Sequence, residues 1–161
     1  MNKIAIISDT HNNYAIAKKI VEILKSEKIN FIIHCGDIGE PDYLKEAFKG
    51  FKVRAVLGNM DEGYGSIKEY QKPPEIIVCE KTKEEEINGK KIAFNHFPKE
   101  AKELAKTGKY DFVFYGHTHK PWEEKVGSCI LLNPGNATGT FYKATFAIYD
   151  FKSGLFTLKI L

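Results

Sequence analysis

The sequence contains no apolar run that approaches the roughly 18 residues needed to cross a membrane. After Met1 the chain carries one lysine and then only the short apolar segment 4–7, so the apolar region of a secretory signal peptide is missing. These absences argue against a membrane-spanning or secreted protein. We therefore expect a cytoplasmic protein that makes no membrane contact.

Cysteine is also scarce. The chain has only three cysteines, Cys35, Cys79 and Cys129, and they lie far apart in the sequence. This number and spacing exclude a disulfide framework and a Cys-x-x-Cys metal site. We expect all of the thiols to be reduced and most of them to be buried.

The sequence has little excess of charge. Its 24 Lys and Arg residues against 21 Asp and Glu residues give a net charge of +3, and the basic residues are not clustered. This distribution argues against binding to a long nucleic acid, which requires a basic face. No linker, internal repeat or low-complexity segment interrupts the 161 residues. We therefore predict a single domain over residues 1–161.

What the chain does contain is a series of short apolar segments. In its first third, runs rich in β-branched residues indicate strands that are buried on both faces. The spacing of Ile16, Ile20 and Ile23 indicates a helix, and Pro41 suits the first turn of another. The predicted order is strand 3–7, helix 14–28, strand 31–34, helix 41–49 and strand 51–57. This alternation predicts parallel strands joined by crossover helices.

The rest of the chain is richer in strands. Glycines and prolines between 63 and 74 indicate a loop, and Asn88-Gly89 and Ser153-Gly154 suit hairpin turns. The further predicted elements are strands 76–80 and 90–95, helix 99–107, and strands 111–115, 128–132, 144–149 and 155–161. The change from alternating elements to consecutive strands predicts an α/β fold, namely a two-sheet α/β sandwich with flanking helices.

Polar residues follow several of the predicted strands. Four of the five histidines stand just after a strand, beside Asp, Asn or Gly. The segments concerned are Asp9-Thr10-His11, Gly36-Asp37, Gly58-Asn59, Asn95-His96 and Gly116-His117-Thr118-His119. Because the carboxyl ends of parallel strands converge on one crevice, we expect these side chains to meet at one edge.

Imidazoles and carboxylates are good ligands for Mn, Fe, Co, Ni and Zn. The set is too large for one tetrahedral ion and suits two ions that share a carboxylate. Each short segment by itself is an ordinary turn sequence, but their combination favours ligands. The glycines before Asp37, Asn59 and His117 would let the backbone turn and leave room at the ions. His34 lies inside a strand, where we expect a buried structural histidine.

The chain resembles the calcineurin-like metallophosphoesterase superfamily in the order of these motifs. The segments Ile-Ser-Asp-Thr-His, His-Cys-Gly-Asp-Ile and Gly-Asn-x-Asp are similar to those of its small YfcE-type phosphodiesterases. The matching motifs extend from residue 4 to about residue 136 and include Asn133-Pro134-Gly135.

The resemblance implies a metallophosphoesterase-like fold and two divalent metal ions, with Mn, Ni, Co, Fe or Zn as candidates. It implies one ion held by Asp9, His11, Asp37 and His119, and another held by Asp37, Asn59, His96 and His117. Asp37 would bridge the two ions. Asn59 and His117 are also the expected catalytic residues at the phosphate, since the Asn59 amide offers both an acceptor and donors. Hydroxide formed from a metal-activated water would attack the phosphorus.

The chain departs from many relatives at two positions. Met60 follows the Gly-Asn pair, where relatives carry a histidine that protonates the leaving group. His96-Phe97-Pro98 stands where relatives read His-Gly-His, so Pro98 takes the place of an imidazole. We therefore expect the proton for the leaving group to come from solvent or another residue. This favours substrates with good leaving groups.

These observations predict an enzyme, a dinuclear-metal phosphodiesterase acting on a small phosphodiester or nucleotide. The alternative is a weakly catalytic or non-catalytic protein-binding scaffold of the retromer-subunit type. The complete ligand set favours the enzyme. Substrate choice would depend on the loop 60–74, where Tyr64 and Tyr70 could contact a substrate or a second subunit. The sequence thus leaves a homodimer open.

Overall fold

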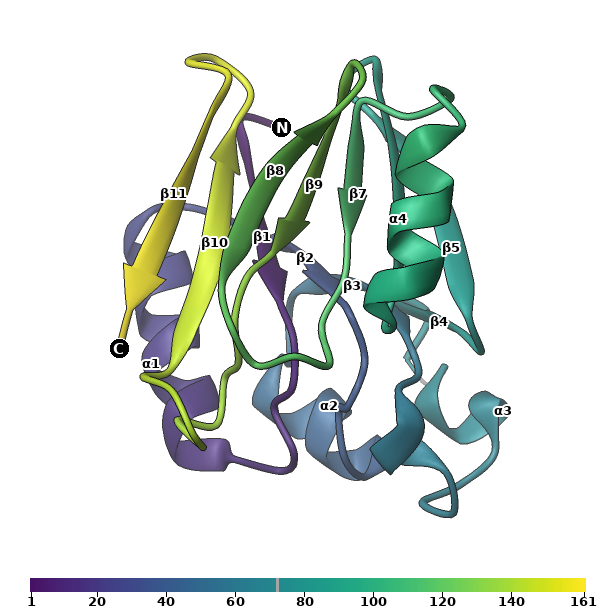
Figure 1. The fold of residues 1–161 in the computed structure, drawn as a ribbon. Coiled ribbons are helices and arrows are strands. Elements are labelled where there is room, and N and C mark those ends of the chain that lie inside the picture. Colours follow the sequence, from purple (N-terminus) through teal and green to yellow (C-terminus); the bar gives the residue numbers. More distant parts are fainter. Residues whose placement is uncertain (72) are drawn as a thin grey trace.

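The computed structural model describes residues 1–71 and 73–161, and Figure 1 shows their arrangement. The helices are α1 (Tyr14–Ser26), α2 (Pro41–Ala47), α3 (Ile67–Tyr70) and α4 (Pro98–Lys106), with a 3-10 turn, η1, at Asn59–Asp61. The strands are β1 (Lys3–Ile7), β2 (Phe31–His34), β3 (Lys52–Val56), β4 (Ile76–Cys79), β5 (Thr82–Ile87), β6 (Lys90–Asn95), β7 (Phe112–Phe114), β8 (Trp122–Val126), β9 (Cys129–Asn133), β10 (Thr145–Asp150) and β11 (Leu155–Ile160). None of the helices in these two ranges is long and apolar enough to cross a membrane.

The first sheet has six strands in the order β11-β10-β1-β2-β3-β4. Strands β1 to β4 are parallel, with Ile6 beside Ile33 and Ile32 beside Val53. Helix α1 follows β1 and α2 follows β2, so the predicted alternation and parallel pairing are confirmed. The hairpin of β10 and β11 joins the β1 edge in antiparallel orientation.

The second sheet has five strands in the order β5-β6-β7-β9-β8. Strands β6, β7 and β9 are parallel, and α4 connects the first two. The predicted Asn88-Gly89 turn is confirmed, since β5 and β6 pair up to Ile87 and Lys90. Asn88 and Gly89 have φ angles of 51° and 75°, as a two-residue hairpin turn of this kind requires.

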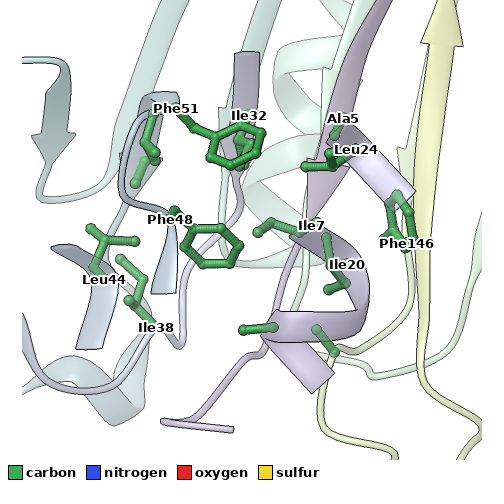
Figure 2. Close-up of a cluster of buried hydrophobic side chains, with 14 of the residues drawn as sticks. Ala5, Ile7, Ile20, Leu24, Ile32, Ile38, Leu44, Phe48, Phe51 and Phe146 are labelled. Atoms are coloured by element: carbon green, nitrogen blue, oxygen red, sulfur yellow. The ribbon is translucent and has the colours of Figure 1, made fainter. Parts of the chain in front are cut away.

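Side chains alternate along β1 between two apolar clusters. Ile4 and Ile6 lie in the cluster between the sheets, whereas Ala5 and Ile7 lie in the cluster beneath α1 and α2. Figure 2 shows Leu24 of α1 within this second cluster. Each isoleucine removed fully from water contributes about 1.5–3 kcal/mol. A smaller cluster lies beneath α4. The layers confirm the predicted two-sheet α/β sandwich with flanking helices.

Two regions differ from the sequence-based prediction. Strand β8 was not expected, because its residues are largely exposed and carry no apolar pattern. The predicted loop 60–74 contains α3 and part of the 3-10 turn. Tyr70 in this region is fully buried and donates a hydrogen bond to the Gly39 carbonyl at 2.6 Å. It therefore cannot contact a substrate or a second subunit, whereas Tyr64 is exposed.

Candidate metal centre

The predicted ligands meet at one edge of the molecule, where strands of both sheets end. They are Asp9 and His11 after β1, Asp37 after β2, Asn59 after β3, His96 after β6, and His117 and His119 after β7. In Figure 1 the arrowheads of β1 and β7 point toward this edge. The expectation that the ends of parallel strands gather these side chains is therefore met.

A first ligand group consists of Asp9, His11 and His119. Asp9 Oδ1 lies 3.3 Å from His119 Nε2 and 4.0 Å from His11 Nε2. One ligand atom from each residue lies within 4.8 Å of the others. A divalent ion with ligands at about 2.0–2.2 Å fits between atoms at these separations.

A second ligand group consists of Asn59, His96 and His117. Asn59 Oδ1 lies 3.1 Å from His96 Nε2 and 3.0 Å from His117 Nδ1. His96 Nδ1 lies 2.9 Å from the Cys35 carbonyl oxygen, to which it donates. With Nδ1 engaged in this bond, loss of the proton from Nε2 leaves a lone pair on the atom that faces Asn59 and Asp37.

Asp37 lies between the two groups and presents one oxygen to each. Its Oδ2 is 3.6 Å from His11 Nε2, and its Oδ1 is 3.4 Å from His96 Nε2. Burial by itself raises the pKa of Asp37, but the His96 imidazole and the Met60 N–H outweigh burial, so the pKa lies below its ordinary value. The carboxylate is therefore ionised and placed as a bridging ligand requires.

Two buried ligand atoms lack ordinary partners. Among the described residues, Asp9 Oδ1 and His11 Nε2 have no hydrogen bond, although both are buried atoms. Buried polar atoms without partners are rare and costly in proteins. A cation held between them would satisfy both, and nitrogen and oxygen donors of this kind suit a divalent transition metal. The residues present therefore fit the ions that the resemblance implies.

Backbone strain is concentrated at the same edge. Positive φ angles occur at Asp9 (55°), His11 (42°), Asp37 (53°), His117 (67°) and His119 (59°). Non-glycine residues rarely adopt this region, and when they do they gather at functional sites. These backbone conformations turn the side chains after β1, β2 and β7 toward the shared centre.

Glycines permit the close approach of these loops. A Cβ at Gly58 would lie 2.1 Å from Asp37 Oδ1, and one at Gly36 would lie 2.7 Å from His96 Nδ1. Of these, only Gly36 has a left-handed φ, 95°. The predicted role in turning therefore holds at Gly36, while Gly58 is required because a side chain there would displace the Asp37 carboxylate.

His34 has the structural role predicted for it. Its side chain is fully buried, its Nε2 donates to Thr10 Oγ1 at 2.9 Å, and its Nδ1 accepts from Gly36 N–H at 3.2 Å. The Thr10 hydroxyl donates to the Ile38 carbonyl and so can only accept from His34. Burial lowers the pKa of His34 to about 3, so this ring is neutral.

Asp61 is a supporting residue to which the sequence analysis gave no role. It is buried, and its carboxylate accepts hydrogen bonds from the N–H groups of Ile38 and Gly39 (2.8 and 2.9 Å) and of Gly58 (2.8 Å). It thereby ties the loop of Asp37 to the loop of Asn59. The available signal was the Gly-x-x-Asp spacing, typical of an acidic side chain that caps a turn.

Two asparagines hold the loop after β7. Asn133 Nδ2 donates to the Gly116 carbonyl at 2.8 Å, and Asn136 Nδ2 donates to the His119 carbonyl at 3.1 Å. Asn133 belongs to a motif that supported the resemblance, whereas Asn136 was not singled out. Both fix the backbone that presents His117 and His119.

The candidate metal centre borders a cavity of about 390 Å³. The cavity is lined by His11, Asp37, Asn59, Met60, His117, His119, Thr138 and Thr140. Met60 is half-exposed at its wall, and its thioether cannot donate a proton. Pro98 begins α4 and offers no ligand atom. The two departures from the family pattern, Met60 and Pro98, thus leave the predicted ligand set intact. Neither residue can donate a proton to a leaving group.

Comparisons with known proteins identify the family of the chain. Residues 2–154 match the model of the calcineurin-like phosphoesterase superfamily domain. The chain is 34% identical over 142 residues to phosphodiesterase MJ0936 of Methanocaldococcus jannaschii, covering 85% of each chain. It superposes on a solved archaeal phosphodiesterase with a TM-score of 0.88 at 29% identity, covering 99% of both chains. The phosphoesterase YfcE of E. coli shares the fold, with a TM-score of 0.68, 17% identity and 98% of both chains covered. The chain therefore belongs to the calcineurin-like phosphoesterase superfamily.

Proposed function

We propose that this protein is a metal-dependent phosphodiesterase with two divalent ions at the edge described above. One ion would be held by Asp9, His11, Asp37 and His119, and the other by Asp37, Asn59, His96 and His117. The observation that carries the proposal is the position of Asp37, with one oxygen 3.6 Å from His11 and the other 3.4 Å from His96. A carboxylate between two ligand groups is what a two-ion centre needs.

When bound, the ions would lower the pKa of a water and offset negative charge on the phosphoryl oxygens. The side chains of the protein orient the ester. Asn59 directs its Oδ1 at the two histidines, so its Nδ2 is free to donate to a phosphoryl oxygen. The exposed ring of His117 has its Nδ1 at Asn59, which leaves Nε2 for the phosphate.

A diester is preferred over a monoester because two relatives at about 30% identity are named phosphodiesterases. The absence of a proton donor at Met60 and Pro98 favours esters with good leaving groups. Mn, Ni, Co, Fe and Zn all suit a mixed imidazole and carboxylate set. The scaffold alternative is less supported, since a scaffold would not need the complete ligand set.

The test is hydrolysis of bis-p-nitrophenyl phosphate and p-nitrophenyl phosphate after the metals are stripped and Mn²⁺, Ni²⁺, Co²⁺, Zn²⁺ or Mg²⁺ is restored singly. We expect metal-dependent turnover of the diester, reduced roughly 100-fold or more in Asp37→Ala. The matched control is Asp42→Ala, which removes an exposed aspartate of α2 whose one ion pair within residues 1–71 and 73–161 is with Lys45. Metal binding without turnover of either ester would overturn the proposed enzymatic activity in favour of the protein-binding scaffold.

A further inference from the structure

A second cavity adjoins the candidate metal centre. It has a volume of about 480 Å³, within the range of small-molecule sites, and lies beside η1 and α3. Asn59 lines both this cavity and the cavity of about 390 Å³ at the candidate metal centre. A phosphodiester carries two ester groups, and a phosphorus atom at Asn59 would have a cavity on either side for them.

Phe97 lines the second cavity and contacts two of the predicted ligands. The residue is 39% exposed, and its ring packs edge-on against His96 and His117, with centroids 5.0 and 5.2 Å away. Phe97 is also the middle residue of the segment that departs from the family pattern, so the departure places an aromatic surface beside two predicted ligands.

The remaining walls select by polarity and charge. Leu57 and Ile67 add apolar surface. The charged groups are the carboxylates of Glu62 and Glu80, the ammonium of Lys81, and the buried Asp61, whose oxygens are occupied by backbone N–H groups. Carboxylates therefore outnumber ammonium groups, which disfavours a substrate with a further phosphate on this side.

We infer that this cavity binds one ester group of the substrate, and that the ester group is a planar aromatic ring without a negative charge that packs on Phe97. The inference rests on the proposed phosphodiesterase and specifies its substrate class as aryl or nucleoside esters rather than polynucleotides. Aromatic pairs of this kind contribute enough to change affinity by roughly three- to tenfold.

The test compares two phosphonates that cannot be hydrolysed, phenylphosphonate and methylphosphonate, bound to the Zn²⁺-loaded full chain in calorimetric titrations. Both carry the same charged group and differ only in the ring. We expect tighter binding of phenylphosphonate, and we expect Phe97→Leu to reduce the ratio of the two affinities by roughly three- to tenfold. Trp122→Ala, which removes an exposed aromatic ring from a different cavity, should leave the ratio unchanged.

A second readout locates the ring. Nuclear Overhauser contacts from the phenyl protons to the methyl groups of Leu57 and Ile67 would support the inference. Equal binding of the two phosphonates, or an equal loss for both in Phe97→Leu, would overturn it, since the latter would mean that Phe97 only positions His96 and His117. Because no turnover is measured, ring-dependent binding without diester hydrolysis would reject the proposed function alone, and hydrolysis without ring preference would reject this inference alone.

Discussion

At the scale of residues, histidines in similar surroundings differ in what their ring nitrogens contact. His34 and His96 are both almost completely buried, and each follows or ends a strand. Both nitrogens of His34 are occupied by Thr10 and Gly36. His96 uses one nitrogen for the Cys35 carbonyl and turns the other toward the ligand groups. The partners of the ring, rather than its burial, separate a structural histidine from a candidate ligand.

The neutral state of His34 predicts a pH dependence of stability. Its folded-state pKa of about 3 is below the unfolded value, so the unfolded chain binds more protons and stability falls as the pH drops from about 6.5 toward 3. Between pH 7 and pH 5 the His34 side chain should lower the free energy of unfolding by about 2 kcal/mol. Urea denaturation at both pH values should show a smaller loss of stability from pH 7 to pH 5 in His34→Gln than in the wild type.

The same prediction has a direct spectroscopic check. The ring resonances of His34 should not titrate between pH 7 and pH 5. A His34 ring that becomes protonated in the folded protein within this range would contradict the prediction, as would parallel losses of stability in the two proteins.

At the scale of elements, the loops that carry the candidate ligands are held by side chains from their neighbours. Asp61 joins the loop after β2 to the loop after β3, and Asn133 and Asn136 brace the loop after β7. Each brace uses backbone donors or acceptors that strand pairing leaves unused. The geometry of the centre therefore depends on contacts between loops as much as on the strands.

Asp61→Ala should weaken both the fold and metal binding. The substitution leaves the buried N–H groups of Ile38, Gly39 and Gly58 without their acceptor, which should lower the free energy of unfolding by about 2–4 kcal/mol. Metal affinity should fall roughly 10- to 100-fold because Asp37 and Asn59 lose their fixed separation. Urea denaturation of the metal-free protein and metal titration measure the two effects.

The control for this substitution is Asp42→Ala, which removes an exposed carboxylate and should change stability by less than about 0.5 kcal/mol. If Asp61→Ala bound metal as tightly as the wild type, the contact between the two loops would have no part in holding the centre.

At the scale of the whole molecule, the candidate centre joins the two sheets. Asp9, Asp37 and Asn59 follow strands of the first sheet, and His96 and His119 follow strands of the second. Elsewhere the sheets meet through the apolar cluster between them and through the ion pair of Arg54 on β3 with Glu85 on β5. Ions held at this edge would therefore connect the two halves of the sandwich.

Metal binding should accordingly stabilise the whole fold. A metal present at 100 times its Kd stabilises the protein by about 2.7 kcal/mol, which corresponds to a rise in Tm of about 5–10 °C for a chain of this size. Thermal denaturation with chelator and with added Mn²⁺ or Zn²⁺ measures this rise. It should disappear in Asp37→Ala and persist in Asp42→Ala, and an equal rise in all three proteins would show that the metal binds elsewhere.

Much of this molecule could be predicted from short stretches of sequence. The buried strands 3–7 and 31–34 and the hairpin at Asn88-Gly89 have local signals, and the structure confirms them. The candidate ligands were found because each follows a strand in a motif only a few residues long. Strand β8 escaped prediction because an exposed edge strand has no apolar pattern, and Tyr70 was misplaced because its burial depends on Gly39, distant in the chain.

The sequence by itself thus determined the order of elements, the sandwich architecture and the set of candidate ligands, because hydrophobic periodicity and motif spacing are local properties. Only the tertiary structure decided which oxygen of Asp37 faces His11 and which faces His96. It also decided that Asp61 ties two loops and that Phe97 borders a second cavity. These features arise between residues far apart in the chain, whose distances are set only when the two sheets pack together.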